Sequence, residues 1–107
     1  MTTFNDRERA EEAHFAHDQE MQFRILARRN KLLGFWAAER MGLSPAETES
    51  YAKGVVQAEF EEAGDEDVVR KLLGDLISAG TEASEADVRE AMKIKEIEAR
   101  RMLMGEA

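Results

Sequence analysis

The sequence has no cysteine, only one proline, and no apolar stretch near the roughly 18 residues that a membrane-spanning helix needs. The absence of cysteine excludes disulfides, thiol catalysis and zinc thiolate sites. The first residues, Met-Thr-Thr-Phe-Asn-Asp, have no basic end followed by an apolar run, so they do not resemble a signal peptide. We therefore expect a soluble, cytoplasmic protein with no direct membrane insertion.

Acidic residues outnumber basic ones, 23 to 15. The net charge of -8 disfavours nucleic acid as a partner, because phosphate binding needs clustered Lys and Arg on an accessible face. A local exception is the group Arg24, Arg28, Arg29 and Lys31. We interpret these four cations as a solvated helix face opposite the apolar residues of the same helix.

Few β-branched residues occur outside Val55, Val56, Val68 and Val69, which favours an all-helical fold. The 107 residues suit one domain with a modest core. Helix-start and helix-end signals predict helices over about 5–41, 45–63, 65–80 and 84–103. These signals are Gly42, Ser44-Pro45-Ala46-Glu47, Gly64, Gly80 and Ser84-Glu85-Ala86-Asp87. Short connections make neighbouring helices antiparallel, so we predict an up-and-down four-helix bundle.

Apolar periodicity predicts which side chains face the core of that bundle. The third helix is expected to be the most buried, and Trp36 is expected to be mostly buried against it. The predicted inward residues are Met21, Ile25, Leu26, Leu32, Leu33, Trp36 and Ala37 in the first helix, Tyr51, Val55, Val56, Ala58 and Phe60 in the second, Val68, Val69, Leu72, Leu73, Leu76 and Ile77 in the third, and Val88, Ala91, Met92, Ala99 and Met102 in the fourth.

The first helix is uneven, because its apolar stripe begins only near Met21. Residues 5–20 carry eight charged side chains, namely Asp6, Arg7, Glu8, Arg9, Glu11, Glu12, Asp18 and Glu20. A helix-prone segment with so little to bury is either a frayed terminus or a segment that folds onto a partner. We therefore divide the chain into a mobile, helix-prone segment over 1–19 and a four-helix bundle over 20–107.

Catalytic and ligand motifs fail on spacing. No glycine-rich phosphate loop is present, although a weak nucleotide contact outside such motifs stays open. Glu11-Glu12-Ala13-His14 has the Glu-x-x-His spacing of carboxylate-bridged di-iron bundles, but those sites need the motif on two helices. Both histidines, His14 and His17, lie on one helix. We expect no metal site and no enzymatic activity.

Several short sequence motifs, in the same order and register, resemble the zeta subunit family of alphaproteobacterial F-type ATP synthases across essentially the whole chain. These motifs are Phe4-x-Asp6-Arg7-Glu8, Glu11 and Glu12, Phe15-Ala16-His17-Asp18, Phe23, Ala27-Arg28-Arg29-Asn30-Lys31-Leu32-Leu33-Gly34, Trp36-Ala37-Ala38, Met41-Gly42, and Asp67-Val68-Val69-Arg70-Lys71-Leu72 with Asp75.

The resemblance implies a four-helix inhibitor of ATP hydrolysis whose N-terminal segment becomes helical in a catalytic interface. The implied partners are the alpha, beta and gamma subunits of the catalytic head, so the protein would be cytoplasmic and peripheral to the inner membrane, and a monomer when free. The expected contact residues are Phe4, Asp6, Arg7, Glu8, Arg9, Glu11, Glu12, Phe15 and Asp18. No cofactor is required, and the resemblance leaves room for weak ATP or ADP binding at unassigned residues.

Two alternatives remain open. One is an acidic helical adaptor, in which the bundle carries the binding. The other is a nucleotide-responsive regulator, in which the Arg24 to Lys31 face or the bundle interior binds ATP or ADP.

Overall fold

A computed structural model describes residues 3–61 and 64–105, and it describes side-chain surroundings for 17–58 and 64–105. The described residues form four helices and no strand: α1 (Thr3–Met41), α2 (Pro45–Glu61), α3 (Asp65–Ser78) and α4 (Glu85–Met104). The all-α, four-helix prediction is confirmed. The helix-prone character of the N-terminal segment is also confirmed, because α1 runs through it and across the boundary between residues 19 and 20 without a break.

The helix boundaries follow from local chemistry. Gly42 adopts a φ of 73°, the left-handed conformation that glycine tolerates at a helix C-terminus. At the start of α2, the Glu47 amide donates to Ser44 Oγ (3.2 Å) and the Ser44 amide donates to Glu47 Oε1 (2.8 Å). Ser84 and Asp87 exchange the same pair of bonds at the start of α4. Both predicted capping boxes are therefore present.

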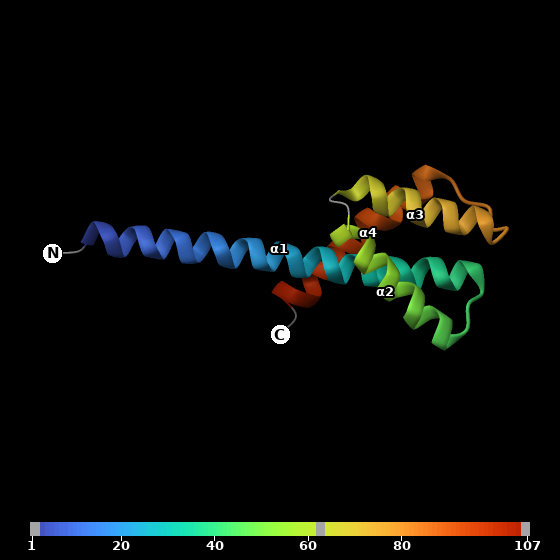
Figure 1. Cartoon of the computed structure of the whole chain (residues 1–107), viewed down its shortest axis with the longest axis horizontal. Helices are drawn as coiled ribbons and strands as arrows, with labels where there is room; N and C mark the ends of the chain where they lie inside the picture. The colour runs from blue at the N-terminus through green and yellow to red at the C-terminus, as the bar shows by residue number, and fades with distance from the viewer. Residues whose placement is uncertain (1–2, 62–63, 106–107) are drawn as a thin grey trace.

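The C-terminal half of α1 is the centre of the bundle (Figure 1). It packs against α2, α3 and α4, and α3 also packs against both α2 and α4. Over the described residues, no Cα atom of α2 comes within 8 Å of one in α4. The bundle is therefore open on the side of α1 that lies between these two helices.

The core lies among the C-terminal half of α1 and the facing sides of the other helices. Its fully or nearly fully buried members are Leu33, Ala37, Val55, Val68, Val69, Leu72, Leu76, Val88, Ala91 and Met92. Ile25, Ala38, Ala52 and Ala99 are buried as well. Most of the inward residues predicted from periodicity are confirmed, while the side chain of Phe60 lies outside the described residues.

Two inward predictions are wrong. Ile77 and Met102 are exposed, with 59% and 48% of their surface accessible. Trp36 is partly buried and packs against the core cluster to which α3 contributes, so its inward placement is confirmed. Its ring also lines a depression with Ala91 and Ile94 of α4. The guanidinium of Arg40 lies 4.7 Å from the centroid of the indole and covers part of it.

Gly34 sets the distance between α1 and α2. A Cβ atom placed on Gly34 would lie 2.6 Å from the Cα atom of Ala52, closer than real atoms approach. Only a residue without a side chain permits this crossing. The small residues at the crossing fix the position of α2 on the bundle.

Candidate functional site: the projecting half of α1

The N-terminal half of α1 extends away from the bundle with no other element beside it (Figure 1). The elongated shape of the molecule, 67 × 29 × 24 Å, reflects this projection. His17, Asp18, Gln19 and Glu20 are all exposed, and Ile25 is the first described residue that is buried. We call residues 3–20 the arm.

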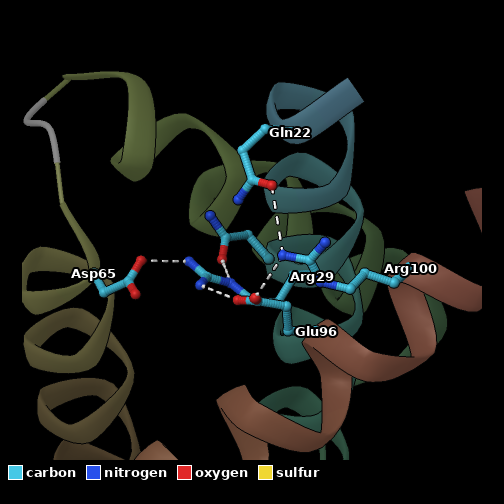
Figure 2. Close-up of polar contacts among 6 residues, drawn as sticks. Gln22, Arg29, Asp65, Glu96 and Arg100 are labelled. Atoms are coloured by element: carbon cyan, nitrogen blue, oxygen red, sulfur yellow. Dashed lines mark hydrogen bonds and ion pairs between the residues drawn. The ribbon is translucent and has the colours of Figure 1, made fainter. Parts of the chain in front are cut away.

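A buried arginine lies where the arm enters the bundle. The side chain of Arg29 is 1% exposed, and its guanidinium donates to Asp65 Oδ1 at the start of α3 (2.9 Å) and to Glu96 Oε1 on α4 (3.1 Å). Its Nε donates to Asn30 Oδ1 at 3.0 Å. Figure 2 shows that these groups converge from three helices. One cation thus ties α1 to α3 and α4.

A second arginine extends this network toward the arm. Arg100 donates to Glu96 Oε2 at 3.3 Å and reaches Gln22 Oε1 at 3.5 Å (Figure 2). Glu96 therefore accepts bonds from two guanidinium groups, and Arg100 joins the end of α4 to α1 only two residues beyond the arm. We call Gln22, Arg29, Asn30, Asp65, Glu96 and Arg100 the clamp.

Burial of the Arg29 charge is expensive unless its donors are satisfied, because a guanidinium taken out of water loses its hydration. Two carboxylates offset that cost, and both are partly exposed, Asp65 more than Glu96. Asn30 is fully buried, and its Nδ2 has no hydrogen-bond partner in the described structure. The clamp thus connects α1 to both α3 and α4, at the cost of one unpartnered buried donor among the described residues.

Arg29 corrects the interpretation of the four cations as a solvated face. Arg24 and Lys31 are exposed, and Arg28 is half-buried, whereas Arg29 is buried. The signal was present in the sequence, since Arg29 lies four residues after Ile25 and four before Leu33, on the buried line of the helix. The burial of Asn30, which follows Arg29 in the sequence, was not predicted either.

The structure places the predicted contact residues on the arm. Asp18 is exposed near the inner end of the arm. The others lie on helical backbone, while their side chains fall outside the described part of the chain: Phe4, Asp6, Arg7, Glu8, Arg9, Glu11, Glu12 and Phe15. Their role in binding stays a prediction.

The perturbed titrating groups hold helices together and do not form a catalytic cluster. Partial burial and a 2.7 Å bond to Asp75 raise the pKa of the Tyr51 hydroxyl. The Arg89 guanidinium holds the pKa of Glu66 below its usual value across the α3 and α4 pair. The Ser44 amide likewise lowers the pKa of Glu47 in the α2 capping box.

Among residues 17–58 and 64–105, no three His, Asp or Glu side chains gather as metal ligands would. The side chains of Glu11, Glu12 and His14 lie outside the described residues, so the prediction that they bind no metal stays a prediction. In the described part of the chain, no helix is long and apolar enough to cross a membrane.

The described structure is a small helical bundle with a long projecting helix, and comparison with known proteins identifies its family. A family model described as ATPase inhibitor subunit zeta matches residues 1–102. The chain belongs to this family. The match includes the arm as well as the bundle, so the resemblance inferred from the sequence motifs is confirmed.

Solved structures support the same fold. A protein determined by solution NMR is 49% identical in sequence and superposes with a TM-score of 0.70, covering 81% of this chain and 99% of that chain. No curated protein matches the chain.

Proposed function

We propose that this chain inhibits ATP hydrolysis by the F-type ATP synthase, with the arm as the inhibitory element. The observation that carries the proposal is the arm itself, a helix that projects from a complete bundle, in a chain that belongs to a family of ATPase inhibitor subunits. Residues that contribute nothing to a described core are available for a partner.

The proposed mechanism is steric. The arm enters the cleft between a catalytic and a non-catalytic subunit, the beta and alpha subunits, and reaches the gamma rotor stalk. The closed catalytic site then cannot reopen, so rotation in the hydrolysis direction stops. If residues 1–19 are mobile in the free protein, they become helical in the cleft, and binding includes the entropy cost of ordering them.

Phe4 and Phe15 are the proposed apolar anchors of the arm. They are eleven residues apart on a continuous helix, about 16 Å along its axis and nearly three full turns, so they lie on almost the same line. An amphipathic helix uses such a line to enter a groove. The charged neighbours Arg7, Arg9 and Glu11 contribute register and encounter rate more than affinity.

The bundle holds the arm near its target. Once the bundle is bound to the catalytic head, the arm has a higher effective concentration at the cleft than a free peptide would have. The entropy cost of inserting the arm is then smaller. The clamp fits this role, since it fixes α1 to the bundle within a few residues of the arm. No cofactor takes part in this mechanism.

ATP hydrolysis by the cognate ATPase, measured with increasing full-length chain, tests the proposal. We expect hydrolysis to fall to a low plateau. Undiminished hydrolysis at a saturating concentration of the chain would refute the inhibitory function. The adaptor alternative predicts binding without inhibition, and the nucleotide-regulator alternative predicts binding of ATP or ADP by the chain alone.

A further inference from the structure

The open side of the bundle holds two adjoining hollows. One, of about 380 Å³, lies between α1 and α2, and the other, of about 350 Å³, is bounded by α1, α2 and the end of α4. Lys31 and Val56 line both, so the hollows adjoin, and we call the two together the groove. Ala27, Ala52, Val56 and Leu103 give the groove an apolar floor and walls. The second hollow lies between α2 and α4, which do not meet over the described residues.

The rim of this groove is cationic, although the protein as a whole is acidic. Arg28, Lys31 and Lys53 line it, and none of the three has a carboxylate at ion-pair distance within the described residues. Lys31 lies 5.8 Å from the centroid of the Phe35 ring, and Arg28 donates only to Met102 Sδ at 3.9 Å, a weak acceptor. Arg24, at the arm end of the groove, is paired with Glu20.

Among cations elsewhere in the described bundle, Arg29, Lys71 and Arg89 each have a carboxylate within 4 Å. Lys93 and Arg101 have none there, but they lie outside both hollows, so the groove is distinguished by three unpaired cations beside one apolar surface. One carboxylate, Glu49, lines the groove, but it pairs with none of the three cations. The groove therefore combines apolar contact area with positive charge that no described group of the chain neutralises.

We propose that this groove binds an acidic, amphipathic segment of the ATPase catalytic head, as a second attachment point beside the arm. The proposal rests on the proposed function for the identity of the partner. Apolar side chains of the segment fill the hollows, and its carboxylates face Arg28, Lys31 and Lys53. The chain's own acidic arm does not occupy the groove, because α1 continues straight and carries the arm away from it (Figure 1).

The position of the groove supports this assignment. It begins at Arg24, four residues beyond the arm on the same helix, so a partner that holds the arm lies next to the groove. Engagement of both surfaces makes the second contact intramolecular, which raises the affinity without a change in the inhibitory element. The groove then governs how tightly the chain binds, and the arm governs whether hydrolysis stops.

Paired charge reversals in the full-length chain test the groove. Lys31→Glu with Lys53→Glu alters the rim, and Lys93→Glu with Arg101→Glu is the matched control, since these two cations are also exposed, helical and without a described carboxylate partner, but lie outside both hollows. Both variants make the same change in net charge. Binding to the purified ATPase and the extent of inhibition at saturation are measured separately.

We expect the rim variant to bind at least about tenfold more weakly than the control variant, while still inhibiting fully at saturation. The salt dependence of its affinity should also be smaller than that of the parent. Equal affinities of the rim and control variants would refute the proposal that the groove binds the ATPase, even if the parent chain inhibits. Groove-dependent binding without inhibition by the parent would instead refute the proposed function and keep the groove.

Photo-cross-linking identifies the occupant. A photoreactive residue at Val56, in the groove, should cross-link to a segment of the head rich in Asp and Glu, and one at the exposed Ile94 should not. Cross-linking of Val56 to a second copy of this chain, or to no protein, would overturn the assignment. Binding of ATP or ADP to the free chain, with NMR shifts confined to the groove, would refute the acidic segment as the occupant and identify a nucleotide as the ligand.

Discussion

Arg29 carries a charge inside the bundle at the point where the arm leaves it. Its guanidinium bridges Asp65 on α3 and Glu96 on α4, so the residue acts through both packing and charge. Arg24, five residues earlier, has a comparable ion pair with Glu20 on the surface, where 59% of each side chain is exposed. Substitution of each arginine therefore allows the contribution of a buried ion pair to be compared with that of an exposed one.

We expect Arg29→Ala to lower the free energy of unfolding by about 3 to 5 kcal/mol, because it removes a large buried side chain and leaves two carboxylates without their shared partner. Arg24→Ala should cost at most about 1 kcal/mol, as exposed pairs do. Urea unfolding followed by circular dichroism gives both values. Similar costs for the two variants would show that Arg29 does not hold the bundle together.

Tyr51 provides a prediction about pH. Its folded-state pKa is raised by burial and by Asp75, so its contribution to stability is complete below its unfolded pKa near 10 and is lost as the pH rises above that value. Tyr51→Phe should therefore lose less stability than the parent between about pH 9 and pH 11. Urea unfolding at both pH values provides the measurement. Parallel losses in the two proteins would contradict the placement of the hydroxyl.

At the scale of the helices, the crossing of α1 and α2 depends on Gly34. Gly34→Ala should destabilise the protein by about 1 to 3 kcal/mol, because the new methyl group meets the backbone of Ala52. Gly74 is the matched control, since it is an exposed glycine within α3 and has open space around it. Gly74→Ala should stabilise the protein by about 0.5 to 1 kcal/mol through helix propensity. Thermal unfolding of both variants should show opposite signs, and a shared sign would contradict the close crossing.

The arm should be dispensable for folding. Removal of residues 1–19 is expected to change the free energy of unfolding by less than about 0.5 kcal/mol, because described burial begins at Ile25. Calorimetry of the truncated and full chains compares the two. A large drop in melting temperature, or a loss of helical dichroism beyond the deleted residues, would show that the arm packs on the bundle.

The predictability of each element from the sequence depends on how local its cause is. Both capping boxes and the Gly42 cap were predicted, because each involves residues within four positions. The periodicity of α1 places Arg29 on the buried line of the helix, but it does not report the partners of Arg29, Asp65 and Glu96, which lie 36 and 67 positions away. The arm was predicted from its lack of an apolar stripe. The groove was not predicted, because it depends on how α1, α2 and α4 are placed relative to one another.

At the scale of the whole molecule, the chain is a projecting helix attached to an acidic bundle with one cationic groove. The arm and the groove lie on the same helix, so a single partner can engage both. The clamp connects α1 to α3 and α4 within a few residues of the arm. In this account, inhibition requires the arm to be helical in its bound state.

A proline scan of the arm tests that requirement most directly. Ala13→Pro costs about 3 kcal/mol wherever residues 9–17 are helical, while Thr3→Pro falls at the first helical residue, where proline is tolerated. The measurement is the concentration of each variant that halves ATP hydrolysis by the cognate ATPase. We predict that Ala13→Pro raises this concentration by about a hundredfold, the equivalent of about 3 kcal/mol, and that Thr3→Pro leaves it near the parent value. Equal inhibition by Ala13→Pro and the parent chain would contradict the helical arm as the inhibitory element.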